Sequence, residues 1–261
     1  MVSPLNWSGG KRWQVPAVLN LLGPRLHGEL QGGARRWVEP FCGGCSMAFG
    51  VLPQNALLND INPDLVNFWQ VLQSDYPFDV NEYDPSLYYG YRDLFNVCMV
   101  PEEKAELFYV LNQWCFNGLW RTNQSGEFNV PQRPVLRPLK EIPLETRKQT
   151  WNWHFTCEDY QTMLFEHDDV IYADPPYDEG HTYSEQFHWN EQQRIAVVLS
   201  LHAGPVVLTN KATPAIQKLY TDLGYQLTII DGQQRFHHSQ GQREPVLEVI
   251  ATRNLLTQVI R

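Results

Sequence analysis

The sequence lacks any apolar run that approaches the length of a membrane-spanning helix, and its N-terminus carries no signal-peptide pattern. A spanning helix needs about 20 consecutive apolar residues, so these absences predict a soluble, intracellular protein. Repeats and low-complexity segments are also missing. With 261 residues, of which 43% are hydrophobic, the chain is long enough for one large domain or for a core domain with a smaller insertion.

Cysteine is scarce, and its distribution argues against two kinds of stabilising site. The odd, scattered set of five disfavours a disulfide framework. Cys42 and Cys45 form one C-x-x-C, but no second such pair and no paired-histidine motif completes a structural zinc site. We therefore expect no metal, and we expect these two cysteines to be small packed thiols in a glycine-rich turn. The other cysteines are Cys98, Cys115 and Cys157.

The chain also lacks the basic excess that is usual in nucleic-acid-binding proteins. Its 20 lysines and arginines face 29 acids, for a net charge of −9, which predicts modest non-specific affinity for DNA at physiological salt. The charge is segregated, however: residues 75–106 carry a net −6, whereas residues 121–148 carry a net +3. The basic stretch is a candidate contact surface for a polyanion, although two ordinary solvated faces would give the same pattern.

What the sequence does contain is an alternation of strands and helices. Apolar runs bounded by turn residues predict strands near residues 37–41, 56–58, 170–173, 206–209, 226–230 and 246–251. Helical spacing predicts helices near residues 14–22, 45–52, 63–72, 191–202 and 214–223. Gly23-Pro24 is expected to end the first helix.

The alternation lapses in the middle of the chain. Between residues 75 and 150 we expect a helix near 101–117 and a loop with a tight turn at 124–126. The order of elements predicts an α/β domain that an inserted segment interrupts. The predicted division is residues 1–64 and 150–261 for the catalytic domain and residues 65–149 for the insertion.

A first motif follows the strand at residues 37–41. The strand W-V-E-P-F runs into C-G-G-C, and Asp60 closes the next strand 21 positions after Glu39. An acid at about this spacing suits the two hydroxyls of a ribose. The turn lacks G-x-G-x-x-G, so adenosine without a diphosphate fits better than a dinucleotide, which disfavours a nicotinamide oxidoreductase. A plain strand-turn-helix unit is the alternative.

A second motif is the run V-I-Y-A-D-P-P-Y at residues 170–177. A buried strand ends at Asp174, and two prolines without N–H groups stop the ladder. A carboxylate, rigid carbonyls and an aromatic ring thus meet at the carboxyl edge of the sheet, where open α/β sheets bind ligands. Asp174 and the Pro175 carbonyl could each accept one hydrogen of an exocyclic amine, while Tyr177 stacks on a flat ring. A simple strand cap at Asp174 is the alternative.

A third, weaker motif is the loop S-G-G-K at residues 8–11. Its glycines allow a ligand to approach the backbone, and Lys11 could meet a carboxylate. A solvated lysine is the simpler interpretation of this residue.

Five motifs occur together and in order: N-W-S-G-G-K, E-P-F-C-G-G, N-D-I-N-P-D-L, R-T-N-Q-S-G-E-F-N-V-P and D-P-P-Y. In this the chain resembles the Dam-type (D12 class) DNA adenine-N6 methyltransferases, from Leu5 to about Asn254. The resemblance implies a Rossmann-like, S-adenosylmethionine-dependent methyltransferase fold, mostly parallel with a seventh antiparallel strand. It also implies methyl transfer to N6 of an adenine everted from double-stranded DNA, in a bacterial or phage-encoded cytoplasmic enzyme.

The resemblance assigns roles residue by residue. The implied catalytic residues are Asp174, Pro175, Pro176 and Tyr177. The implied S-adenosylmethionine contacts are Trp7, Lys11, Glu39, Phe41, Asp60, Asp159 and Asp174. The implied DNA contacts are Arg121, Asn123 and Asn129 in the inserted hairpin, and Arg235 and Arg243 near the closing strand that carries Glu248.

Three departures from the family pattern bear on the DNA target. The GATC-methylating members have lysine, an aromatic residue and arginine where this chain has Asn6, Thr122 and Ser125. We therefore expect a target other than simple GATC. Other amino acceptors (cytosine N4, RNA adenine, a glutamine amide) and a non-catalytic DNA-binding module are alternatives that Asp174 and the hairpin disfavour. We expect a monomer, and the sequence leaves open whether a cognate restriction enzyme is its functional partner.

Overall fold

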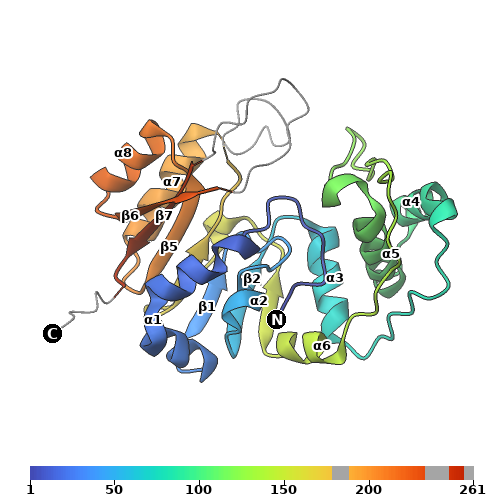
Figure 1. The fold of residues 1–261 in the computed structure, drawn as a ribbon, viewed down its shortest axis with the longest axis horizontal. Helices are drawn as coiled ribbons and strands as arrows, with labels where there is room; N and C mark the ends of the chain where they lie inside the picture. Colours follow the sequence, from blue (N-terminus) through green and yellow to red (C-terminus); the bar gives the residue numbers. More distant parts are fainter. Residues whose placement is uncertain (178–187, 233–246, 256–261) are drawn as a thin grey trace.

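The computed structural model describes residues 1–177, 188–232 and 247–255, and these form a seven-stranded sheet with flanking helices (Figure 1). The strand order is β3-β2-β1-β4-β5-β7-β6. The strands are β1 (Arg36–Glu39), β2 (Asn55–Asn59), β3 (Trp153–Thr156), β4 (Val170–Ala173), β5 (Val206–Lys211), β6 (Gln226–Asp231) and β7 (Leu247–Arg253). Pairings from β3 to β5 are parallel, and β7 is antiparallel to both its neighbours. The expected Rossmann-like methyltransferase sheet is confirmed.

Helices cover both faces of this sheet. They are α1 (Val15–Gln31), α2 (Ala48–Val51), α3 (Pro63–Gln73), α4 (Tyr88–Val97), α5 (Pro101–Trp114), α6 (Leu144–Thr150), α7 (Trp189–Ser200) and α8 (Pro214–Asp222). Successive strand residues point to opposite faces of the sheet and so contribute to two cores. Trp37 and Tyr172 pack with α1 to α3, whereas Val38 and Ile171 pack with α7 and α8. Within the described parts of the chain, every helix is too short or too polar to traverse a lipid bilayer.

The segment labelled α1 consists of two helical stretches that meet at a break. Gly23 leaves helical geometry, with φ 69° and ψ 165°, directly before Pro24, as a Gly-Pro pair favours. Helix α1 nevertheless resumes and runs to Gln31. Leu30 in the resumed part is completely buried in the first core. The predicted break at Gly23-Pro24 is therefore confirmed. The sequence does not predict the second helical stretch that follows the break, which packing against the first core stabilises.

Residues 65–149 contain more helix than their pattern indicates. The pattern predicts neither α4 nor α6, and the ten residues of α4 bury only Tyr88 and Phe95. Helix α5 packs on α3 through aromatic rings, with the Phe68 and Phe108 centroids 5.5 Å apart. One hydrophobic core thus continues from the sheet into this segment. The division of the chain into two domains stays a prediction.

The predicted tight turn at residues 124–126 is confirmed. Thr122 pairs with Phe128 in an antiparallel bridge, and the Asn123 N–H donates to the Glu127 carbonyl at 2.8 Å. Phe128 is buried, while the turn itself is exposed. A short hairpin therefore projects from the insertion on a fixed aromatic base.

The N-terminal loop is fastened to the insertion rather than to the sheet. The side-chain amide of Asn112, completely buried on α5, accepts from the Asn6 N–H at 2.8 Å and donates to the Asn6 carbonyl at 2.9 Å. The Ser8 N–H donates to the Gly118 carbonyl at 3.2 Å. This clamp holds the loop that carries Lys11, so the insertion helps to set the position of that lysine.

Alanine at Gly118 tests the clamp. Gly118 has a φ of +63°, and a Cβ there would collide with the Asn6 carbonyl; Gly126, with a φ of +80°, has open space at that position. We expect Gly126→Ala to lower the free energy of unfolding by about 1 kcal/mol, the cost of a left-handed Cβ. Gly118→Ala adds a steric clash and should lower it by about 2–3 kcal/mol. Urea unfolding measures both, and equal losses would contradict the clamp.

Candidate active site

A cavity of about 450 Å³ lies at the carboxyl ends of β1, β2 and β4. Its walls come from the N-terminal loop, the glycine-rich turn after β1, the end of β2, the D-P-P-Y turn and the insertion. Among the residues that line it are Trp7, Lys11, Glu39, Phe41, Asp60, Leu119, Trp120, Tyr172, Asp174, Pro175, Pro176 and Tyr177. The fold therefore brings the predicted catalytic residues and all but one of the predicted cofactor residues to one cavity.

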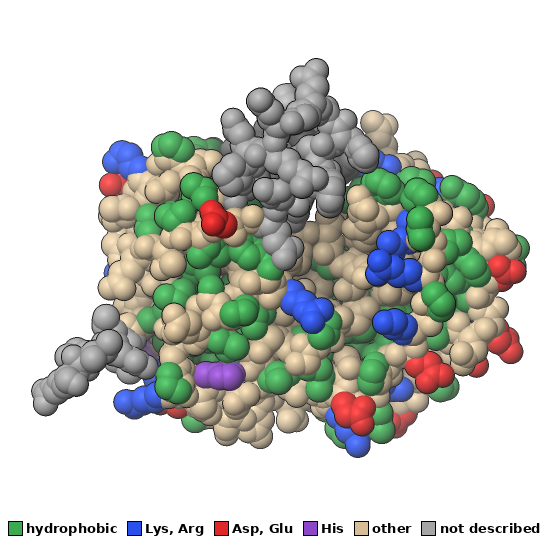
Figure 2. Space-filling view, viewed as in Figure 1, with side chains coloured by type: hydrophobic (Ala, Val, Ile, Leu, Met, Phe, Trp, Pro, Cys, Tyr) green, Lys and Arg blue, Asp and Glu red, His purple; other side chains and the backbone are tan. Residues whose placement is uncertain are grey.

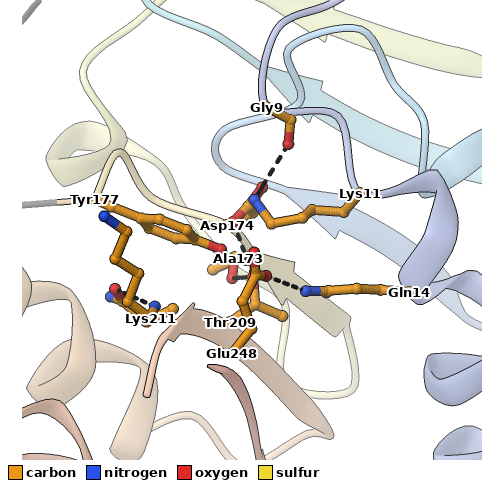
Figure 3. Close-up of polar contacts among 10 residues, drawn as sticks. Gly9, Lys11, Gln14, Ala173, Asp174, Tyr177, Thr209, Lys211 and Glu248 are labelled. Carbon is orange, nitrogen blue, oxygen red and sulfur yellow. Dashed lines mark hydrogen bonds and ion pairs between the residues drawn. The ribbon is translucent and has the colours of Figure 1, made fainter. Parts of the chain in front are cut away.

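The Asp174 carboxylate lies between two donors (Figure 3). Its Oδ2 is 3.0 Å from Lys11 Nζ, and its Oδ1 accepts from the Thr209 hydroxyl at 2.9 Å. Lys11 is only 6% exposed and also donates to the Gly9 carbonyl at 3.1 Å. The simpler interpretation of Lys11 as a solvated lysine is therefore wrong. Because a carboxylate can accept about four hydrogen bonds, Asp174 can still accept from an incoming amine.

Tyr177 is held at its ring and at its hydroxyl. Lys11 Nζ lies 4.4 Å from the ring centroid, a cation–π distance. The hydroxyl donates to Glu248 Oε2 at 3.2 Å, and the same oxygen accepts from Gln14 Nε2 at 2.5 Å (Figure 3). Burial raises the pKa of Tyr177 well above its ordinary value, and the Asp174 charge adds to the rise. The hydroxyl thus stays protonated and donates, which fixes the plane of the ring.

Glu39 is a buried acid on the cavity wall. It is 2% exposed and accepts from the Trp37 indole N–H at 2.8 Å. Burial raises the pKa of Glu39 to about 8, and the Asp174 charge adds to the rise. At neutral pH Glu39 is therefore mostly protonated, so the cavity has an acid that a positively charged ligand would ionise.

Asp60 joins the end of β2 to the glycine-rich turn. Its carboxylate accepts from the Gly43 N–H at 2.9 Å and from the Asn62 N–H at 3.0 Å. Burial raises its pKa above the ordinary value for aspartate. Both carboxylate oxygens are thus fixed at the cavity edge, at the position where the sequence predicts a ribose contact.

The glycine-rich turn also serves the protein's own packing. An added Cβ at Gly43 or Gly44 would lie 2.7 Å or 2.5 Å from the Trp7 side chain. The close approach that these glycines permit is therefore made by Trp7. Cys42 and Cys45 are buried in the same turn, as predicted, and burial raises the pKa of Cys45 to about 11, so both cysteines are packed thiols.

Asp159 is the predicted cofactor residue that lies outside the cavity wall. It is exposed after β3, and its carboxylate accepts from the Gln161 N–H at 2.9 Å. Its neighbour Tyr160 packs against Phe41, with ring centroids 5.1 Å apart, so Asp159 lies beside the Phe41 wall. Its contact with a cofactor stays a prediction.

Part of the predicted DNA surface lies on the hairpin. The Asn123 side-chain oxygen accepts from two N–H groups of the turn, those of Ser125 and Glu127, both at 2.9 Å. Arg121 Nε donates to Asn129 Oδ1 at 3.0 Å. Figure 2 shows basic side chains on the face of the insertion, over α5. Their contacts with DNA stay a prediction, and the predicted contacts Arg235 and Arg243 lie outside the described residues.

The sequence interpretation missed several side chains that shape this site. Thr209 and Asn210 are polar residues in a buried strand, and Gln14 and Gln192 are completely buried glutamines on helices. Polar residues at buried positions of an apolar pattern are informative. That signal was available for Thr209 and Asn210, which follow V-V-L at a strand end.

Comparison with known proteins agrees with this geometry. The family model described as D12 class N6 adenine-specific DNA methyltransferase matches residues 7–237. The DNA N-6-adenine-methyltransferase of Escherichia phage P1 is 32% identical over 86% of this chain, which spans only 32% of that protein.

Two further relatives match over nearly their whole length. The retron Ec67 DNA adenine methylase of Escherichia coli is 29% identical, covering 96% of this chain and 91% of that protein. The DNA adenine methylase of Escherichia coli K12 is 29% identical, covering 95% and 93%. A family model that extends over most of the chain settles the relationship that the five motifs suggest. The chain belongs to the D12 class N6 adenine-specific DNA methyltransferase family.

Proposed function

We propose that this adenine-N6 methyltransferase takes its methyl group from S-adenosylmethionine and acts on an adenine everted from double-stranded DNA. The observation that carries the proposal is the single cavity shared by an amine acceptor, Asp174, and a nucleoside-type acid, Asp60. A base and a cofactor bound there would meet inside one cavity, which favours direct transfer.

The residues of one half of the cavity fit the cofactor. Phe41 and Ile61 line the cavity and offer apolar surface for an adenine ring, and Ile61 is 67% exposed. The fixed carboxylate of Asp60 would accept from ribose hydroxyls, and Glu39 would face positive charge. Bound S-adenosylmethionine would supply an electrophilic methyl group on a sulfonium.

The other half fits an adenine. Lys11 covers one face of the Tyr177 ring, so the base would stack on the opposite face. Asp174 and the Pro175 carbonyl would each accept one hydrogen of the N6 amine, directing its lone pair along the line of attack. Transfer makes N6 cationic, and the adjacent Asp174 carboxylate would stabilise that charge until a proton leaves.

The hairpin would read the DNA target. Its exposed residues include Thr122 and Ser125, and Asn6 is occupied by a hydrogen bond to Gln113 at 3.0 Å. A short amide so engaged cannot reach as far as the lysine of the GATC-methylating members. We therefore propose that the target differs from simple GATC.

Loss of the Asp174 carboxylate should abolish methylation. We expect Asp174→Ala and the isosteric Asp174→Asn to lower kcat by at least about 10²-fold. The asparagine variant is needed because alanine leaves buried Lys11 without a hydrogen-bond acceptor at residue 174, whereas the asparagine oxygen can still accept from it. Single-molecule sequencing of DNA from expressing cells measures N6-methyladenine. Near-normal methylation by both variants would refute the role of Asp174, and an unmodified wild-type sample would refute the function.

Cofactor binding should release a proton from Glu39. The Glu39 pKa of about 8 should fall when a positive charge binds nearby. At pH 7, binding should therefore release up to about one proton, and affinity should rise with pH until about 8. Calorimetry in two buffers with different ionisation enthalpies counts the protons. Glu39→Gln should remove this release; an unchanged proton count in that variant would exclude Glu39 as the source.

Ser125→Arg should change the preferred DNA sequence without changing cofactor affinity. Ser125 lies at the exposed hairpin tip, and an arginine there could reach base edges or phosphates. The methylated motif, read by sequencing, and the cofactor Kd are the two measurements. The same motif in both proteins would show that the hairpin tip does not read the target.

A further inference from the structure

Gln192 on α7 reaches the D-P-P-Y turn from beneath the cavity. It is completely buried, and its Nε2 donates to the Pro176 carbonyl at 2.7 Å. Its Oε1 accepts from Asn210 Nδ2 at 2.8 Å, and Asn210 also donates to the Tyr220 hydroxyl at 3.2 Å. Three elements, α7, β5 and α8, therefore join in a buried hydrogen-bonded chain that ends on the turn.

The network determines which way each amide points. Asn210 Oδ1 accepts from the Lys211 backbone N–H at 2.9 Å, so the NH₂ group of Asn210 must face the other partners. Gln192 must then present its oxygen to Asn210 and its NH₂ to Pro176. If the Gln192 amide were flipped, its oxygen would face the Pro176 carbonyl oxygen and its NH₂ group would face that of Asn210, so both hydrogen bonds would be lost. The Lys211 N–H, two hydrogen bonds away from Gln192, thus fixes the orientation in which Gln192 donates to the Pro176 carbonyl.

This bond is well placed to set the geometry of the turn. Pro175 and Pro176 have no N–H groups, so hydrogen bonds can hold the backbone there only through the carbonyl oxygens. The Pro176 carbonyl and the Tyr177 nitrogen share one planar peptide, so holding that oxygen orients the backbone of Tyr177. The bond also keeps the Pro176 carbonyl from competing with the Pro175 carbonyl, which we propose accepts a hydrogen bond from the N6 amine.

We infer that Gln192, oriented by Asn210, is a positioning residue for methyl transfer. This inference rests on the proposed role of the D-P-P-Y turn. Among the described residues, the cavity walls do not include Gln192, so it acts through Pro176 and Tyr177. It sets the amine acceptor and the stacking ring and leaves the cofactor contacts unchanged.

Docking of α7 does not explain the bond. Ile195, Ala196 and Leu199 of α7 are completely buried against the sheet, and they supply the apolar contact that fixes the helix. The Tyr225 hydroxyl also donates to the Ala196 carbonyl at 2.9 Å. A second hydrogen bond therefore holds the same helix without touching the turn, and it provides a matched control.

The first test compares Gln192→Leu with Tyr225→Phe. Each variant loses side-chain hydrogen bonds made at α7, but only the first releases Pro176. We expect Gln192→Leu to lower kcat on duplex DNA at least tenfold, with the S-adenosylmethionine Kd within twofold of wild type. Tyr225→Phe should keep kcat within twofold. An unchanged kcat in Gln192→Leu, or equal losses of kcat in both variants at similar Tm, would overturn the inference.

The second test uses Gln192→Glu, which keeps the shape of the side chain. A protonated glutamic acid can donate to the Pro176 carbonyl and accept from Asn210, whereas an ionised one cannot donate. We expect kcat of this variant to approach wild type at low pH and to fall as pH rises, through a limb that wild type lacks. A pH profile parallel to wild type would overturn the inference.

The comparison isolates residue 192 because its surroundings are the same in both proteins. The charged and titratable groups on the elements around it include Asp174 and Tyr177 at the turn, Lys211 on β5, Tyr220 on α8, and His188 and Glu191 at the start of α7. Each is present in wild type, so their titration cancels in the ratio of the two profiles. Absence of N6-methyladenine from the wild-type reaction would instead overturn the proposed function, and with it this inference.

Discussion

Two consecutive prolines leave the D-P-P-Y turn with few backbone donors, and the site is organised around that constraint. The strand that precedes the turn is held by its ladder, but the ladder stops at the prolines. Side chains from four other segments hold the turn instead: Lys11 and Thr209 on Asp174, Gln192 on Pro176 and Glu248 on Tyr177. The acceptor, the carbonyls and the ring are thus fixed before any ligand binds, as efficient positioning requires.

The same constraint makes the cavity depend on the insertion. Lys11 can hold Asp174 only if its loop is in place, and that loop is fastened by Asn112 of α5 and by the close approach of Gly118. The aromatic contacts between α3 and α5 join these residues to the sheet. A segment that we assign to DNA recognition therefore shares a rigid connection with the Asp174 carboxylate, so displacement of the hairpin base could reach the site through packed atoms.

The sequence predicted the parts of the site that depend on local signals. Strand-ending acids at Asp60 and Asp174 and the turn at residues 124–126 all follow from apolar runs and turn residues, and their positions agree with the structure. The remainder depends on contacts between distant residues. Gln192 lies 16 positions from its partner Pro176, and no local pattern pairs them. Likewise α1 continues past its break because of packing that its own sequence does not reveal.

The charge of the cavity suits the cationic methyl donor that we propose. Glu39, Asp60 and Asp174 line the cavity, and Lys11 is the one lysine or arginine among the described residues of its wall. Burying a carboxylate without a compensating charge is costly, and the raised pKa of Glu39 reflects that cost. A sulfonium would relieve it, whereas the thioether left after transfer would not. Methyl transfer moves the positive charge toward Asp174, and loss of the N6 proton then removes it from the cavity. The acids that favour binding of the donor would thereby weaken retention of the product, so the electrostatics that promote the reaction also promote turnover.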